Sequence, residues 1–156
     1  MPDMLVKLYE LPDNTEINNK MREIGIDVRR AIAPEKHAVV DWVRSNFDSA
    51  WTSECEAAFT NHPASCYIAV ENGRMIGFAC YDATCRNFFG PTGVGTEARG
   101  KGIGTALLLK CLYAMEADGY GYAIIGGAGP VDFYSRTVGA TVIEGSKPGI
   151  YRDLLT

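Results

Sequence analysis

The chain has 156 residues, of which 47% are hydrophobic and 22% are charged. This length suits one domain, or one domain with a short appendage, and the composition is that of a folded protein. Nineteen acidic against fifteen basic residues give a net charge of −4, so the chain as a whole lacks the basic footprint of a nucleic-acid-binding protein. No apolar run approaches the roughly 20 residues that span a bilayer, and charges interrupt the first residues, so we expect a cytoplasmic protein with no membrane partner.

The cysteines and histidines predict no metal site. The five cysteines are odd in number and form no CxxC pair, and the two histidines complete no zinc-ligand spacing. We expect most of the cysteines to be small buried side chains in a reducing compartment. Nothing in the sequence indicates a catalytic cysteine, which would need a basic partner close to it.

Residues 1–25 are predicted to form an N-terminal appendage, and residues 26–156 the main domain. Within the appendage, a mostly apolar run over residues 5–11 predicts a short strand that ends at Pro12. Thr15–Ile24 is polar with weak helical spacing, which predicts one or two helical turns.

The main domain begins with one strand and two helices. Ile26–Ile32 is predicted as a strand, and a helix starts at Pro34, where the missing N–H of proline costs nothing. A second, shorter helix is predicted from Thr52 or Ser53, whose hydroxyl can cap it, to Phe59.

A hairpin and a third strand follow. Asn72-Gly73 joins Cys66–Glu71 to Met75–Tyr81, and Asn-Gly between two such runs is a strong signal for a β-hairpin. Cys85–Val94 is predicted as the next strand, although Gly90-Pro91 interrupts it. Because proline cannot donate to a strand ladder, we expect a bulge or a splay there.

The longest helical signal starts at Ile103 and ends near Gly119, a predicted C′ residue. Tyr120–Ile125 is an apolar strand that runs into the glycine-rich residues 126–130. The order of elements predicts a mixed sheet with helices on its faces. The remaining predicted elements are a short helix after Pro130 and two closing strands, Ala140–Ile143 and Ile150–Leu155.

The segment that leads into the longest helix, residues 93–105, is rich in glycine (GVGTEARGKGIGT). Small residues let the backbone approach a ligand, and unpaired N–H groups at the start of a helix attract anions. Arg99 and Lys101 add positive charge. The segment predicts a phosphate or pyrophosphate site; a close-packed turn that needs glycine only for steric reasons is the alternative.

Two phosphate-binding motifs fit this segment only in part. Gly95–Gly102 approaches a P-loop, but the final position needs a hydroxyl for magnesium and Gly102 has none. Gly93-x-Gly95-x-x-Ala98 matches the dinucleotide fingerprint, but Gly126-Gly127 stands where an acidic residue should end the next strand.

A third pattern fits better. Arg99-x-x-Gly102-x-Gly104 resembles the acyl-CoA pyrophosphate loop of the GNAT acetyltransferase superfamily, in which Arg or Gln, two residues, Gly, one residue, and Gly or Ala follow one another. The resemblance extends from about Ile26 to the C-terminus. Its other parts are Asp27–Ile32 ahead of Pro34, the Asn72-Gly73 hairpin, and Phe133-Tyr134 followed by Gly139-Ala140.

The resemblance implies an α+β fold. Its sheet would be mixed, mostly antiparallel, splayed between the fourth and fifth strands and flanked by helices on both faces. CoA would lie in the gap, with its pantetheine arm on the main chain of residues 89–94 and its pyrophosphate on residues 99–105. The implied cofactor-binding residues are Gly93, Val94, Arg99, Gly100, Lys101, Gly102, Ile103, Gly104 and Thr105.

The implied activity is the direct transfer of an acetyl group from acetyl-CoA to a primary amine, without a metal. The departing thiolate would take a proton from Tyr134, the second residue of the Phe-Tyr pair, and a backbone N–H would stabilise the oxyanion. The chain departs from the family here: five positions separate Tyr134 from Gly139 where four are common, and glycines replace an asparagine usually found at the end of strand five.

The acceptor ammonium must lose a proton before it attacks, which requires a base. Asp82, at the end of the third strand, is the predicted general base; Glu54 and a water chain stay open as alternatives. The residues predicted to wall the acceptor pocket are Trp51, Glu54, Phe88 and Phe89.

The acceptor is expected to be a small-molecule or peptide amine, and a homodimer stays open. Two alternatives to the enzyme remain at this stage. One is a non-catalytic acyl-CoA-binding or sensing module on the same fold, and the other is a P-loop-like nucleotide phosphohydrolase that uses the Gly95 loop.

Overall fold

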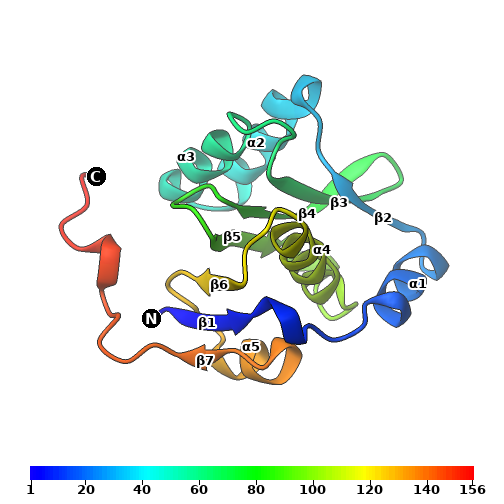
Figure 1. Cartoon of the computed structure of the whole chain (residues 1–156). Coiled ribbons are helices and arrows are strands. Elements are labelled where there is room, and N and C mark those ends of the chain that lie inside the picture. The colour runs from blue at the N-terminus through cyan, green and yellow to red at the C-terminus, as the bar shows by residue number, and fades with distance from the viewer.

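The computed structural model describes residues 1–156. Seven strands form one sheet in the order β2-β3-β4-β5-β6-β1-β7, with helices on both faces (Figure 1). Every paired strand is antiparallel to its neighbour except β5 and β6, which are parallel. The architecture confirms the predicted α+β class.

The bounds of the elements follow. The strands are β1 (Met4–Lys7), β2 (Ile26–Arg30), β3 (Cys66–Glu71), β4 (Arg74–Tyr81), β5 (Phe88–Val94), β6 (Tyr122–Ile125) and β7 (Thr141–Val142). The helices are α1 (Thr15–Glu23), α2 (Lys36–Asn46), α3 (Ser49–Ala58), α4 (Ile103–Ala117) and α5 (Val131–Val138), with short 3-10 turns η1 (Leu8–Glu10), η2 (Ala33–Glu35), η3 (Thr96–Ala98) and η4 (Gly149–Tyr151). None of the helices has the length and apolar character needed to span a bilayer.

The predicted β3–β4 hairpin is confirmed. Asn72 and Gly73 both have positive φ, 51° and 73°, which the two central residues of a type I′ turn require. Neighbouring residues of β4 point to opposite faces of the sheet: Ala79 packs in the core beneath α4, whereas Phe78 and Cys80 pack in the core beneath α2 and α3. The sheet is therefore covered by apolar side chains on both faces.

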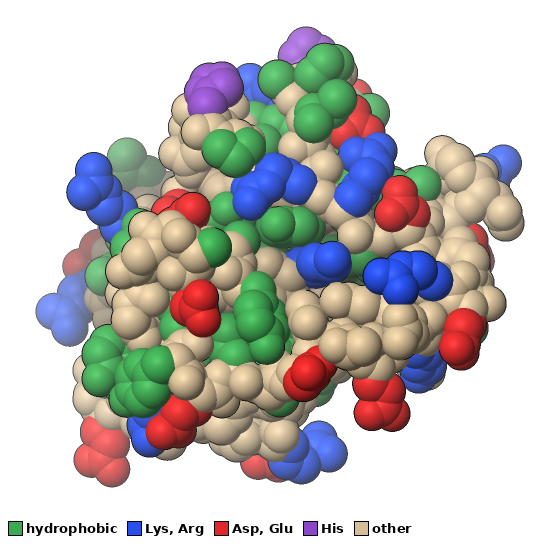
Figure 2. All heavy atoms as spheres, turned by 45° about the vertical axis from the view of Figure 1, so that its right-hand side comes forward, with side chains coloured by type: hydrophobic (Ala, Val, Ile, Leu, Met, Phe, Trp, Pro, Cys, Tyr) green, Lys and Arg blue, Asp and Glu red, His purple; other side chains and the backbone are tan.

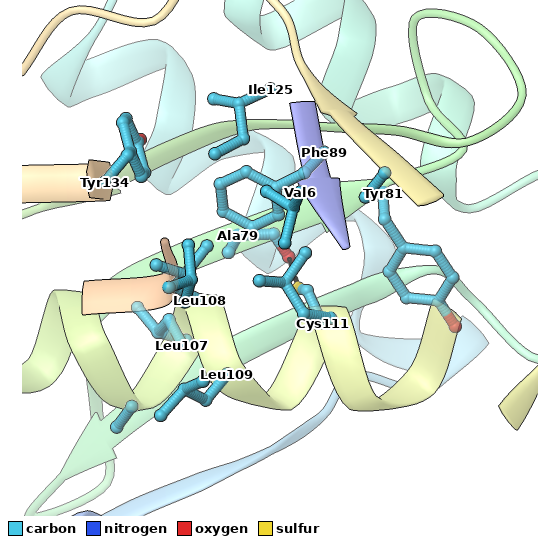
Figure 3. Packing of buried hydrophobic residues seen from close by; sticks show 14 of the residues in the cluster. Val6, Ala79, Tyr81, Phe89, Leu107, Leu108, Leu109, Cys111, Ile125 and Tyr134 are labelled. Atoms are coloured by element: carbon cyan, nitrogen blue, oxygen red, sulfur yellow. Dashed lines mark hydrogen bonds between the residues drawn. The ribbon is translucent and has the colours of Figure 1, made fainter. Parts of the chain in front are cut away.

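The larger core lies between α4 and the sheet. In Figure 3, Leu107, Leu108 and Cys111 of α4 point toward Val6 of β1 and Phe89 of β5. All five side chains are buried, so α4 holds strands from both halves of the sheet against one apolar surface.

The N-terminal strand β1 lies inside the sheet, between β6 and β7. Met4 pairs with Ile125 on one side and with Val142 on the other. The strand predicted over Ile150–Leu155 is wrong: that segment begins in the turn η4 and continues as an exposed tail. The charged residues Arg152 and Asp153 interrupt the apolar residues of this segment, which belongs to no strand of the sheet.

The sheet opens between β5 and β6. These strands pair only at Phe88↔Ile124 and Phe89↔Ile125, after which β5 continues to Val94 against β4 alone. Gly90, the first residue past the pairing, has φ of 122°, a conformation that favours glycine. The splay predicted between the fourth and fifth strands of the main domain is confirmed at this place.

The position of β1 leads to a prediction about stability. Val6→Asp should lower the free energy of unfolding by about 3 kcal/mol or more, because it places a carboxylate in the apolar core beneath β1 without a partner. Urea denaturation measures this change. Lys7→Gln, at the exposed next position of the same strand, should shift stability by less than about 0.5 kcal/mol. Equal small effects of the two substitutions would contradict a structural role for β1.

Candidate active site

The loop between β5 and α4 carries a row of free backbone donors. Gly100 and Gly102 have φ of 84° and 87°, in the left-handed region that glycine tolerates best. No backbone N–H from Arg99 to Thr105 donates a hydrogen bond to another protein group. These groups open α4, a helix of 15 residues whose dipole adds positive potential at this end. The arrangement can bind an anion such as a diphosphate.

A cavity of about 490 Å³, the loop cavity, lies against this loop. The structure brings most of the predicted cofactor-binding residues to it. Two are elsewhere: Lys101 is exposed outside the lining, and Gly93 packs against Phe47, whose ring would overlap a side chain at that position. The lining residues are Val94, Ala98, Arg99, Gly100, Gly102, Ile103, Gly104, Thr105, Pro130 and Phe133.

A lysine that the sequence analysis missed also approaches the loop. A Cβ on Gly102 would lie 3.4 Å from Nζ of Lys20 and 3.1 Å from Cδ1 of Ile17, both on α1. Lys20 therefore adds a cation beside the free amides, in addition to Arg99. No local spacing links α1 to a loop some eighty residues later, so only the packing of α1 against α4 reveals this neighbour.

A second cavity, the splay cavity, has a volume of about 400 Å³ and lies where β5 and β6 separate. Pro130 lines both cavities, so the two adjoin at the start of α5. Phe89, Ile125 and Tyr134 lie close together at this place (Figure 3). The lining residues are Met1, Trp51, Glu54, Thr84, Phe89, Gly90, Pro91, Thr92, Ile125, Gly126, Gly127, Ala128, Gly129, Pro130, Tyr134 and Tyr151.

Tyr134 is the tyrosine of the splay cavity that lies on α5. Its side chain is 5% exposed and its ring packs edge-on against Phe89, with centroids 6.4 Å apart. Burial raises the pKa of Tyr134 to about 12, so the hydroxyl is protonated at neutral pH. Gly139, five positions after Tyr134, takes φ of 66° and closes α5.

The two acidic candidates lie in different surroundings. Asp82 does not line the cavity: one of its carboxylate oxygens accepts from the Asn87 N–H at 2.8 Å and the other from the Tyr120 hydroxyl at 3.0 Å. Glu54, on α3, does line the cavity, and one of its oxygens accepts from the Thr84 hydroxyl. Burial raises the pKa of Glu54, as expected for a half-buried carboxylate.

The predicted aromatic wall is formed in part. Trp51 and Phe89 line the splay cavity. Trp51 also belongs to an aromatic cluster, with its ring centroid 4.9 Å from that of Phe47. Phe88 is not part of the lining and packs beside Gly126 instead. Both histidine side chains lie on the outer surface, where they stand at the top of Figure 2, and neither lines the cavity.

Sequence reasoning missed two further residues of this cavity. Thr84 lies in the β4–β5 loop, and Tyr151 lies in η4 near the C-terminus. The Tyr151 hydroxyl lies so close to Gly126 that a Cβ there would overlap it. The glycine-rich run after β6 is the local signal that could have indicated them, since glycine lets a neighbouring side chain approach the backbone closely.

One group of side chains has the chemistry to hold a metal ion. The thiols of Cys55, Cys66 and Cys80 lie within 4.8 Å of one another, on α3, β3 and β4. All three residues are fully buried in the core beneath α2 and α3, and none lines either cavity. They are separate from the candidate active site.

Comparison with protein families gives one match. Residues 36–139 match the model of the acetyltransferase (GNAT) family. This chain belongs to the GNAT acetyltransferase family. The match spans the sequence from the start of α2, through the loop between β5 and α4, to the end of α5, so both cavities lie largely within it.

Three solved structures illustrate the shared GNAT fold. A GCN5-related glucosamine N-acetyltransferase region of a fungal multi-domain GH3 β-N-acetylglucosaminidase has a TM-score of 0.74 and 20% identity, over 91% of this chain and 19% of that one. A GCN5-related N-acetyltransferase from Sphaerobacter thermophilus has a TM-score of 0.69 and 20% identity, over 91% of this chain and 48% of that one. A GCN5-related N-acetyltransferase from Kribbella flavida has a TM-score of 0.61 and 19% identity, over 90% of this chain and 53% of that one.

At these identities the likeness concerns the fold alone. The chain also spans at most 53% of the length of these three proteins. Comparison with curated protein sequences gives no match.

The position of Lys20 generates a binding prediction for this GNAT domain. Lys20→Ala should weaken CoA binding about fivefold, or ~1 kcal/mol, because one exposed cation beside the free amides of the loop is lost. Isothermal titration at low salt measures the change, and pantetheine, which lacks the diphosphate, should bind unchanged. Arg22→Ala removes the same charge from the same helix away from the loop and serves as the control. If both variants weaken CoA equally, the effect is one of net charge, contrary to the assignment.

Proposed function

We propose that the protein is an acetyl-CoA-dependent N-acetyltransferase that transfers the acetyl group directly to a primary amine. The observation that carries this proposal is the junction of the two cavities at Pro130. A diphosphate bound to the amides that open α4 would direct the attached thioester arm along β5 into the splay cavity. The phosphohydrolase alternative is set aside because the chain belongs to an acetyltransferase family.

The residues around the gap fit acetyl-CoA. The free N–H groups of residues 99–105, with Arg99 and Lys20, would hold the diphosphate. Beyond Phe89, β5 pairs with β4 alone, so its other edge has free backbone groups. An extended arm with two amide groups can bind to such an edge as an added strand would.

Two side chains would handle the protons of the reaction. The acceptor nitrogen forms a bond to the acetyl carbon as the carbon–sulfur bond breaks, and the sulfur leaves as a thiolate. Tyr134, which is protonated at neutral pH, would donate a proton to that sulfur. Glu54 replaces Asp82 as the proposed base because it lines the cavity and Asp82 does not. It would accept the acceptor's proton directly or through water.

The role of Tyr134 is tested by removing its hydroxyl. Tyr134→Phe should lower kcat about 100-fold while the Kd for CoA stays the same, since the hydroxyl acts on the leaving group. Release of free thiol over a panel of amines measures turnover, and titration calorimetry measures CoA binding. Tyr113→Phe, whose hydroxyl bonds to the Pro12 carbonyl outside both cavities, is the control.

Two results would count against this assignment. Full activity of Tyr134→Phe would exclude Tyr134 as the proton donor. Saturable CoA binding by the unaltered protein without thiol release from any amine would favour the non-catalytic acyl-CoA-binding module.

The pH dependence tests Glu54 as the base. At saturating acceptor, kcat should rise with pH through one ionisation whose midpoint lies above the ordinary carboxyl value of 4.5, because burial raises the pKa of Glu54 and the base must be ionised. In Glu54→Gln this rise of kcat with pH, the acidic limb of the pH profile, should disappear, and kcat should fall. Glu56→Gln, an exposed position of the same helix, should keep the limb. Persistence of the limb at the same midpoint in Glu54→Gln would assign it to another group.

A further inference from the structure

We infer that the C-terminal turn η4 forms a wall of the acceptor pocket, and that this pocket takes a compact amine with one positive charge and no anionic group. The inference rests on the proposed function and concerns which amines reach the thioester. It joins three observations: the charge of the cavity, the way Tyr151 is held, and the space available.

The charge of the cavity selects a cation. Glu54 is the single charged side chain among the residues that line it. One Glu54 oxygen accepts from Thr84, and the other has no hydrogen-bond partner in the protein, so it can accept from an ammonium. No lysine, arginine or histidine side chain lines the cavity to pair with a carboxylate or phosphate of the acceptor. Met1 also lines the cavity, but its α-ammonium is fully exposed to water, so an anion beside the half-buried Glu54 carboxylate would lose water and meet a like charge.

The turn that carries Tyr151 is attached to the rest of the fold near the cavity. The Asp3 N–H donates to Ser146 Oγ at 2.8 Å, and Asp3 Oδ1 accepts from the Gly127 N–H at 2.8 Å. Asp3 therefore joins the segment before η4 to the glycine-rich segment after β6. The C-terminal tail beyond Tyr151 is exposed, yet the Tyr151 side chain is half-buried.

Tyr151 lies at the Glu54 end of the cavity. Its hydroxyl lies against Gly126, where a side chain would have no room. Burial, together with the neighbouring Glu54 carboxylate, raises the pKa of Tyr151 to about 12, so the phenol stays neutral and polar beside that carboxylate. Trp51, Tyr134 and Tyr151 together give the pocket aromatic walls, which suit the apolar body of a small amine and can face its cation.

The space available limits the acceptor. The cavity of about 400 Å³ must hold the thioester end of CoA as well as the amine. With Tyr151 in place, only a compact acceptor fits beside the thioester. Removing the Tyr151 ring would enlarge the pocket on the side of the exposed tail without touching the anion-binding loop.

The test of charge uses three related amines with the unaltered protein and acetyl-CoA: phenylethylamine, phenylalaninamide and phenylalanine. The last two have nearly the same size and differ by one carboxylate charge. We expect kcat/KM for phenylalanine to be at least tenfold below that for phenylalaninamide, with phenylethylamine a substrate. Equal values for the last two would overturn the exclusion of anions.

The test of size uses Tyr151→Ala with phenylethylamine and a bulkier amine, the amide of a diphenylalanine dipeptide. The variant should raise kcat/KM for the dipeptide amide at least tenfold relative to phenylethylamine. Ile150→Ala, an exposed neighbour in the same turn that does not line the cavity, is the matched control and should leave the ratio unchanged. An unchanged ratio in Tyr151→Ala would overturn the assignment of η4 as a wall.

Binding separates failure of this inference from failure of the proposed function. Titration of the same amines into the CoA-saturated protein measures their Kd without turnover. If the protein binds phenylethylamine and excludes phenylalanine but releases no thiol with any amine, the proposed function fails and the pocket assignment stands. If the protein turns over amines but treats phenylalanine and its amide alike, the pocket assignment fails and the proposed function stands. If no amine in the set binds or reacts, the pocket assignment is overturned.

Discussion

The short pairing between β5 and β6 is the constraint on which the candidate site depends. Two residue pairs join these parallel strands, and beyond Phe89 the strands part. Had the pairing continued, the edge of β5 would be occupied by hydrogen bonds and the space between Tyr134 and Glu54 would be closed. The opening does not unfold the sheet because α4 packs against strands on both sides of it and buries an apolar face of its own.

The first residues of the chain help to hold this opening in shape. β1 lies between β6 and β7, the Pro2 carbonyl accepts from the Ala128 N–H at 2.7 Å, and Asp3 accepts from the Gly127 N–H. The glycine-rich segment after β6 is thus bonded to the N-terminal segment, while Tyr151 packs against it from the C-terminal side. Both ends of the chain therefore meet at the cavity where we propose that the reaction occurs.

The two cavities differ in the charge they offer. The loop cavity presents free amides with Arg99 and, nearby, Lys20, so it is suited to a diphosphate. The splay cavity presents one carboxylate, that of Glu54, and aromatic rings, so it is suited to an ammonium. The positive groups and the carboxylate thus lie at opposite ends of one path. This arrangement favours the phosphates of one molecule at the loop and the ammonium of a second molecule, the acceptor, at the other end.

The sequence by itself determined the features that depend on residues close together in the chain. The glycines before the longest helix predicted a loop with free amides, Asn72-Gly73 predicted the hairpin, and Gly90-Pro91 predicted a bulge or a splay, because turn conformation and helix starts depend on local backbone chemistry. The tertiary structure alone decided which distant side chains share the cavity. It joined Tyr151 to Glu54, brought Lys20 to Gly102, placed β1 between β6 and β7, and left Asp82 outside, because such neighbours are set by packing across the whole chain rather than by any spacing along it.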